Sequence, residues 1–185
     1  MYSVFIADDE LIIRQGLQCI IDWNGLGFEI IGEASNGTDA LDFILKKQPD
    51  LVLLDIRMPQ MLGLEVVQAA REQGYSGKII ILSGFTDFKY AQAAIRYGVE
   101  YYLTKPIDEN ELYETVQSIA AQFQEQQHLE KTLNQYRNKA KSMILLDIMT
   151  NRADLDLLNL KDINLDADQY QVVIYEKYSH HATCM

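Results

Sequence analysis

Short apolar runs, each followed by a polar residue, recur along this chain and constrain its fold more than any other feature. Four of the runs fit buried strands, at Tyr2–Ala7, Asp50–Leu54, Gly77–Leu82 and Val99–Thr104. Parallel strands gather their carboxyl ends at one edge of a sheet, and open α/β sheets bind ligands in the crevice beyond that edge. The polar residues at these ends are therefore expected to share one site: Asp8 with Asp9, Asp55, Ser83 and Lys105.

Helical patterns alternate with the apolar runs, as in successive βαβ units. A further strand is expected at Phe28–Ala34, and helices are expected at Glu10–Asp22, Gly37–Lys47, Leu64–Gln73, Phe88–Tyr97 and Asp108–Gln124. The pattern predicts an α/β fold with a five-stranded, doubly wound parallel sheet. Right-handed crossovers are expected to place alternate helices on opposite faces.

The pattern changes after about residue 124. A Gln- and Glu-rich helical stretch without Gly or Pro continues to about Met149, which predicts a first domain at 1–124, a helical linker at 125–150 and a fragment of a second domain at 151–185. The fragment contains one expected strand, Tyr170–Tyr178. Apolar residues along the linker keep four–three spacing, which fits either the seam of a dimeric coiled coil or packing against the same chain. These residues are Leu129, Leu133, Tyr136, Ala140 and Met143.

Composition limits the partners and the compartment. The 27 acidic and 16 basic residues give a net charge of −11, so most of this surface would repel nucleic acid. The N-terminus does not resemble a secretory signal, and no apolar run is long enough to span a membrane. Cys19 and Cys184 provide neither a disulfide framework nor a paired metal motif, which favours the cytoplasm.

Charge balance at the strand ends favours a divalent cation. Two carboxylates ~4 Å apart repel by about 4 kcal/mol at an effective dielectric near 20, so three acids need more positive charge than Lys105 supplies. Mg²⁺ prefers oxygen ligands and commonly binds through one or two carboxylates and a phosphate. With a phosphoryl group of about −2 on one acid, the site sums to about −1 with the metal and about −3 without it. The Ser83 hydroxyl and the Lys105 ammonium suit contacts to the phosphoryl oxygens.

Four short motifs, in this order and at these intervals, resemble the receiver (CheY-like) domain of two-component response regulators over about residues 2–124. The motifs are Asp8-Asp9-Glu10, Asp55-Ile56-Arg57-Met58-Pro59, Ser83-Gly84 and Lys105-Pro106. The long helix, together with Ile21-Asp22-Trp23 and Gly27-Phe28-Glu29, is similar to the subgroup that ends in an AraC-type helix-turn-helix domain, which is absent from this chain.

The resemblance implies roles for individual residues. Asp55 would accept a phosphoryl group from a phosphohistidine on a sensor histidine kinase, and Lys105 and Ser83 would contact that group. Mg²⁺ would be held by a set of oxygen ligands: Asp8, Asp9, Asp55 and the backbone carbonyl of Arg57. Tyr102 would be the switch aromatic, turning inward as Ser83 moves toward the phosphoryl group.

It also implies a function and partners. The chain would be a homodimeric signalling protein, not an enzyme beyond its own phosphotransfer and dephosphorylation, and it would control transcription through the missing DNA-binding domain. The readout and dimer surface would lie within Phe88–Phe123, a cis bond would precede Pro106, and Leu62 replaces an Asp that many relatives carry. Phe85, two residues past Ser83, is expected to alter the lifetime of the phosphorylated state.

Other interpretations remain open. A haloacid dehalogenase-type phosphatase also uses a strand-end Asp with Mg²⁺, but it needs a second acid two residues later, where this chain has Arg57. A receiver fold that works as a phosphorylation-independent interaction module is the stronger alternative. A metal site at His180, His181 and Cys184 is disfavoured because chain termini are rarely ordered.

Overall fold

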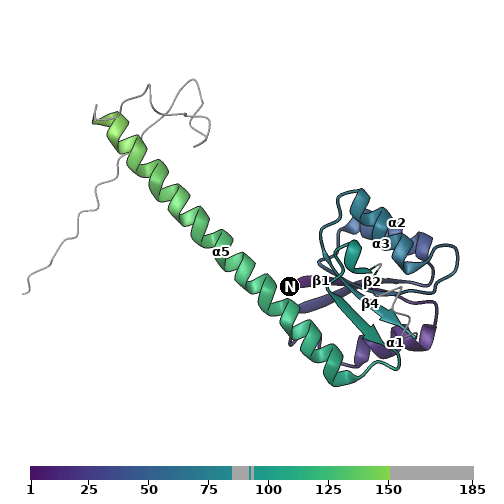
Figure 1. Ribbon diagram of the computed structural model, residues 1–185. Coiled ribbons are helices and arrows are strands. Elements are labelled where there is room, and N and C mark those ends of the chain that lie inside the picture. The colour runs from purple at the N-terminus through teal and green to yellow at the C-terminus, as the bar shows by residue number, and fades with distance from the viewer. Residues whose placement is uncertain (85–91, 93, 151–185) are drawn as a thin grey trace, which may run out of the picture. The chain divides into compact units, whose positions relative to one another are not determined.

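A parallel five-stranded sheet in the order β2-β1-β3-β4-β5 is the centre of the computed structural model, which describes residues 1–84, 92 and 94–150 (Figure 1). The strands are β1 (Tyr2–Ala7), β2 (Phe28–Ala34), β3 (Leu51–Asp55), β4 (Lys78–Ser83) and β5 (Tyr101–Thr104). The helices are α1 (Leu11–Cys19), α2 (Gly37–Lys47), α3 (Gly63–Glu72) and α5 (Glu109–Met149). The predicted fold class is confirmed.

Two apolar layers hold the helices on the sheet. One layer packs α2 and α3 against alternate side chains of the sheet, through residues such as Ile44 and Val67. The other packs α1 and the start of α5 on the opposite face, through Leu17 and Val116, and Figure 1 shows α1 across the sheet from α2 and α3. The expectation that alternate helices lie on opposite faces is wrong. Right-handed connections change face only where the strand order reverses, so α2 and α3 share a face.

Most element boundaries follow the apolar pattern, and the exceptions have local causes. Helix α1 ends at Cys19, before the expected Asp22. The carbonyl of Leu17 near this end accepts from the Trp23 indole N–H at 2.8 Å. Strand β5 begins at Tyr101, because the N–H of Val99 donates to the Ala94 carbonyl instead of a neighbouring strand.

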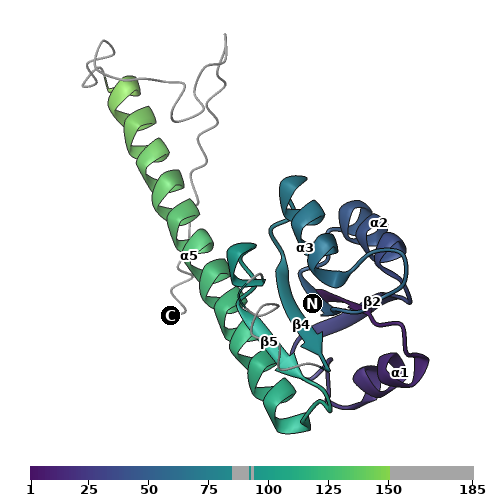
Figure 2. The same cartoon turned by 45° about the vertical axis from the view of Figure 1, so that its right-hand side comes forward.

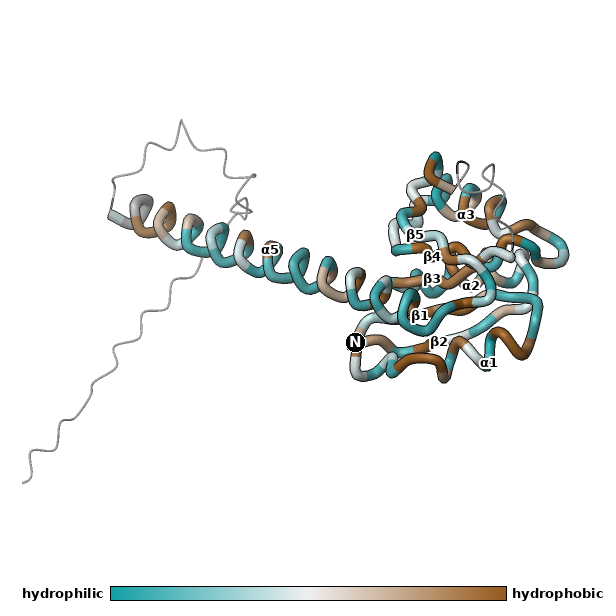
Figure 3. The backbone as a smooth tube through the Cα atoms, turned by 60° about the horizontal axis from the view of Figure 1, so that its bottom comes forward, coloured by the Kyte–Doolittle hydropathy of each residue, from teal (hydrophilic) through white to brown (hydrophobic). Residues whose placement is uncertain are grey.

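The first turns of α5 are anchored on the sheet by aromatic residues. The rings of Tyr2 and Phe123 lie 4.6 Å apart, and Gln122 donates to the Tyr101 hydroxyl at 2.7 Å. Figure 2 shows this part of the helix alongside β5. The helix continues without a break to Met149, and the chain divides into two units, residues 1–127 and 128–185. Hydrophobic residues concentrate in β3, β4 and α1 (Figure 3).

Several expectations fall wholly or partly outside the described residues: half of the helix at Phe88–Tyr97, Phe85, the strand at Tyr170–Tyr178, and His180, His181 and Cys184. Among the described residues, no helix has both the length and the apolar character needed to cross a bilayer.

Candidate functional site

The ends of four parallel strands deliver the predicted site residues. Asp8 and Asp9 follow β1, Asp55 is the last residue of β3, Ser83 is the last residue of β4, and Lys105 follows β5. The ladder pairs Asp55 with Leu82 and Ser83 with Thr104, so these side chains project from the same edge of the sheet. A polar side chain does not end the ladder, which explains why β3 and β4 each extend one residue past the predicted boundary.

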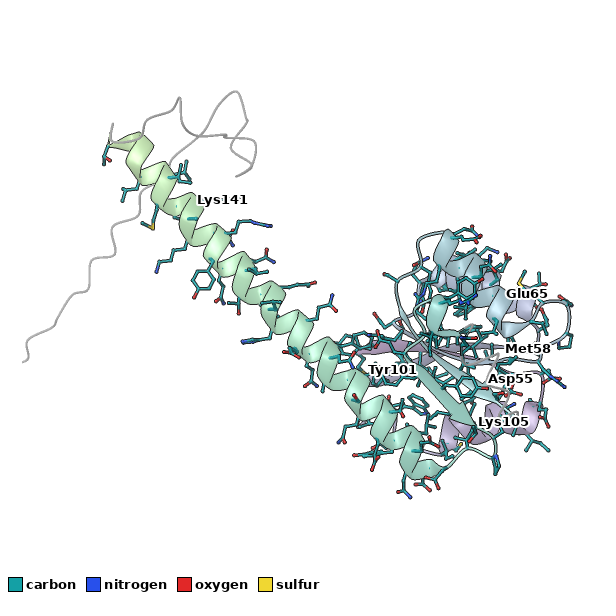
Figure 4. The ribbon with its side chains drawn as sticks, in the orientation of Figure 1. Asp55, Met58, Glu65, Tyr101, Lys105 and Lys141 are labelled. Carbon is teal, nitrogen blue, oxygen red and sulfur yellow. The ribbon has the colours of Figure 1, made fainter. Side chains whose placement is uncertain are left out.

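Lys105 connects two buried acids. Its Nζ lies 2.6 Å from Asp8 Oδ2 and 2.7 Å from Asp55 Oδ1. Asp8 is fully buried, Asp55 is 5 % exposed, and the lysine side chain is 15 % exposed. The peptide bond between Lys105 and Pro106 is cis, as expected, and the Lys105 N–H donates to the Ser83 carbonyl at 2.7 Å. Figure 4 shows Asp55 and Lys105 near each other. Tyr101, at the start of β5, lies farther away.

One shared cation leaves an excess of negative charge. Burial raises the pKa of the Asp55 carboxyl above its ordinary value, with the charge of Asp8 adding to the rise, and Lys105 only partly opposes this. Burial lowers the pKa of Lys105, but its hydrogen bonds to Asp55 and Asp8 outweigh burial and hold that pKa above its usual range. Both shifts follow from a lysine placed between two desolvated carboxylates.

The backbone around Asp55 fixes the direction of its carboxylate. The Arg57 N–H donates to Asp55 Oδ2 at 2.8 Å, and the Gly63 N–H donates to the Ile56 carbonyl at 2.8 Å. A Cβ on Gly63 would collide with the Asp55 carbonyl oxygen, so only glycine lets α3 start this close to the end of β3. The preceding Leu62 donates its N–H to Glu65 Oε2 at 2.8 Å, so the helix start is still capped without an Asp at that position.

A cavity of about 240 Å³ opens over these groups. Its lining residues are Asp9, Glu10, Asp55, Ile56, Arg57, Ser83, Gly84 and Lys105. Ser83 is buried, whereas Asp9 and Glu10 are exposed at the rim. The predicted acids, hydroxyl and amine therefore meet at one place, with Asp8 joined to them through Lys105.

The acid cluster is suited to a divalent cation. One carboxylate oxygen from each of Asp8, Asp9 and Glu10 lies within 4.8 Å of the others, and hard oxygen donors of this kind are what Mg²⁺ prefers. Glu10 belongs to this cluster although it was not among the expected ligands. The run of three successive acids was the sequence signal that could have placed it there.

Tyr102 lies outside this cavity. Its ring packs on the α2–α3 side of the sheet, while Tyr101 packs on the α1–α5 side, and both are half-buried. The two neighbours point to opposite faces because successive side chains of a strand alternate.

Comparison with known proteins agrees with this geometry. The sequence profile of the response regulator receiver domain matches residues 4–117. The receiver domain of AraT, a response regulator from Geobacillus stearothermophilus, superposes with a TM-score of 0.64 and 40 % identity, covering 68 % of this chain and 98 % of that one. A chain of the CheX–CheY–BeF3–Mg²⁺ complex from Borrelia burgdorferi gives a TM-score of 0.59 and 26 % identity, covering 64 % and 88 %.

Curated relatives are described as transcriptional regulators. YesN of Bacillus subtilis, described as an uncharacterized transcriptional regulatory protein, is 38 % identical over 162 residues, which cover 84 % of this chain and 44 % of YesN. The transcriptional regulatory protein HptR of Staphylococcus aureus is 42 % identical over 112 residues, covering 60 % and 44 %. The chain thus spans about half the length of the curated relatives it matches. By its fold, its site and its sequence, the chain belongs to the response regulator receiver domain family of two-component systems.

Proposed function

We propose that this chain is a phosphorylation-controlled switch in which Asp55 accepts a phosphoryl group from a phosphohistidine of a sensor kinase. The observation that carries the proposal is the placement of Lys105 Nζ against both Asp8 and Asp55 at the floor of an open cavity. A buried carboxylate with a cation beside it and free volume above it has what an acceptor of a charged group requires.

In the transfer, a carboxylate oxygen of Asp55 attacks phosphorus and the phosphorus–nitrogen bond of the donor breaks, with its electron pair returning to the imidazole. Lys105 exchanges its contact with Asp55 for one with a phosphoryl oxygen, and the Ser83 hydroxyl donates to another. Mg²⁺, when bound, neutralises phosphoryl charge and helps to orient the group. The oxygens proposed to hold it are those of Asp8, Asp9, Asp55 and the Arg57 carbonyl.

The second step is a change of packing. Ser83 sits at the end of β4, directly paired with Thr104 of β5, and Tyr102 lies two residues earlier on β5. Movement of the Ser83 hydroxyl toward the phosphoryl group therefore changes the surroundings of the Tyr102 ring, which is half-buried on the α2–α3 side of the sheet. We assign Tyr102 the role of switch aromatic on this basis.

The phosphodonor is proposed to bind beside α1. An apolar groove of about 310 Å³ is lined by α1 residues together with Lys105, Pro106 and Ile107, so it continues from the acceptor cavity through Lys105. Ile12 on its rim is 81 % exposed, and α1 is among the most hydrophobic helices in Figure 3. A kinase that presents a phosphohistidine to Asp55 has to cover this surface, and its burial would favour the complex.

The stripe along the second part of α5 is proposed as a dimer seam. Its residues are exposed to similar extents: Leu129 58 %, Leu133 55 %, Tyr136 70 % and Met143 60 %. Apolar side chains at heptad spacing are stabilised when a second helix covers them.

The output is proposed to be transcriptional control. YesN and HptR are transcriptional regulatory proteins by description and about twice as long as the matched region, so DNA binding is assigned to a further domain of the AraC type. The protein is placed in the cytoplasm, where kinase and DNA are both accessible.

Incubation with acetyl phosphate and MgCl₂ tests the switch. Intact mass spectrometry should detect one added phosphoryl group on the wild-type chain and none on Asp55→Asn. Asp42→Asn, which removes an exposed carboxylate that pairs with Lys46, should be labelled as the wild type is. A wild-type chain that stays unlabelled would favour the phosphorylation-independent interaction module instead. An Asp55→Asn chain that is labelled equally would show that another residue accepts the phosphoryl group and would contradict the role proposed for Asp55.

A further inference from the structure

A buried arginine lies behind the acid cluster and takes no part in the proposed chemistry. Among the described residues, Arg14 on α1 is the basic residue whose side chain is buried, with 8 % exposed. Burying a guanidinium is costly unless its donors are satisfied. The groups that accept hydrogen bonds from the Arg14 guanidinium therefore indicate the role of this side chain.

Its strongest contact is with the backbone that carries two of the acids. Arg14 Nη1 donates to the Asp8 carbonyl at 2.7 Å and lies 3.4 Å from the Asp9 carbonyl. The Glu10 side chain does not cap α1, whereas the Glu10 N–H donates to Asp8 Oδ1 at 3.0 Å, so the turn that Arg14 contacts also fixes one oxygen of the Asp8 carboxylate. The guanidinium connects the loop between β1 and α1 to the helix that follows it.

A second acid, from β2, faces the other side of the guanidinium. Glu33 Oε1 lies 3.5 Å from Arg14 Nε, which has no hydrogen-bond partner of its own. Glu33 Oε2 accepts from Gln18 Nε2 at 2.8 Å. Glu33 is itself paired with Ile6 in the β1–β2 ladder, so the arginine is held against the sheet while it holds the loop.

We infer that Arg14 is a positioning residue for the divalent cation, an inference that rests on the proposed function. It sets the backbone at Asp8 and Asp9 and thereby the separation of their carboxylates. The Glu33 carboxylate offsets the positive charge of the Arg14 guanidinium, which would otherwise oppose binding of a cation nearby. The effect of Arg14 on the metal is thus geometric, and its loss should weaken Mg²⁺ binding without removing any ligand.

The chain offers a matched control. Arg71 on α3 also donates to two backbone carbonyls, those of Tyr75 at 2.7 Å and Tyr97 at 3.3 Å, and it does not line the acceptor cavity. Arg71→Gln therefore removes an equivalent set of contacts far along the chain from the acids. A general loosening of the fold would affect both variants, whereas loss of positioning would affect only Arg14.

Titration of the ¹⁵N-labelled chain with MgCl₂, followed by the backbone amides of Asp9 and Arg57, measures the effect. Arg14→Gln should raise the Kd for Mg²⁺ by about tenfold or more, as for other residues that orient metal ligands, while Arg71→Gln should leave it unchanged. Arg14→Lys, which can reach one carbonyl but not also Glu33, should fall between. The rate of labelling by acetyl phosphate in Arg14→Gln should recover at saturating MgCl₂.

Unchanged Mg²⁺ affinity in Arg14→Gln, or an equal loss in Arg71→Gln, would overturn the inference. If Arg14→Gln does not fold, Arg14→Lys decides: weaker Mg²⁺ binding in a folded chain supports positioning, and wild-type affinity contradicts it. A wild-type chain that binds no Mg²⁺ would contradict the proposed function as well, whereas wild-type binding with unaffected variants would contradict this inference alone.

Discussion

Replacing Lys105 with methionine removes the cation that Asp8 and Asp55 share. Two unit charges about 2.7 Å apart attract by about 6 kcal/mol at an effective dielectric near 20, and Lys105 makes two such contacts, at 2.6 and 2.7 Å. Desolvation of the three groups offsets much of this attraction. Loss of one partner from a buried ion pair typically costs 3–5 kcal/mol, so Lys105→Met should lower the free energy of unfolding by about 3–5 kcal/mol at neutral pH without Mg²⁺.

The pH dependence gives this prediction a definite sign. The pKa of Lys105 is raised in the folded chain, so its stabilising contribution is present at neutral pH and is lost only as the pH rises through that pKa. In Lys105→Met, the Asp55 carboxyl, whose pKa burial raises, destabilises the fold only while it is ionised. The deficit should therefore shrink as the pH falls toward about 4, and it should also shrink as MgCl₂ is added.

Urea unfolding of both chains, between pH 4 and 8 and with or without MgCl₂, measures these effects. Lys78→Met is the matched control, because it breaks an exposed lysine–carboxylate pair with Glu100 and should cost less than about 1 kcal/mol. A Lys105→Met deficit that matches the control, or that does not change with pH, would refute the account of a shared cation.

Other variants test separate parts of the structure. Gly63→Ala should lower the free energy of unfolding by about 1–3 kcal/mol in urea, because the new Cβ meets the Asp55 carbonyl; unchanged stability would contradict the close approach of α3. Asp55→Asn should raise the Mg²⁺-free stability, since burial raises the pKa of that carboxyl, and a lower stability would contradict that origin of the shift. Ile12→Glu should slow phosphotransfer from a sensor kinase but not labelling by acetyl phosphate, and equal slowing of both would exclude α1 docking. Leu133→Glu, in the apolar stripe of α5, should shift the sedimentation coefficient toward that of a monomer. An unchanged coefficient would contradict a dimer seam along this stripe.

Strand-level features were accessible from the sequence because buried parallel strands leave uninterrupted apolar runs. The limits of β1 and β2 were predicted to the residue, and the convergence of Asp55, Ser83 and Lys105 followed from their positions at strand ends. The distribution of helices over the two faces was not predicted correctly, because it depends on the spatial order of the strands, which the apolar pattern does not encode.

Features that depend on one side chain reaching a distant backbone group were not predicted. Trp23 ends α1 early by donating to Leu17, and Arg14 reaches the carbonyls of Asp8 and Asp9. A basic residue three positions before Leu17, a core residue of the same helix, was a signal for the latter. Periodicity alone counts such a residue as a mismatch instead of a buried contact.

Chemical trapping of the phosphorylated chain tests the central claim most directly. Borohydride reduces an aspartyl phosphate to homoserine, so peptide mapping after acetyl phosphate, MgCl₂ and borohydride identifies the acceptor itself. The account predicts homoserine at position 55, dependent on Mg²⁺ and diminished in Lys105→Met. Homoserine at another aspartate, or none in a chain that carries a phosphoryl group, would contradict it.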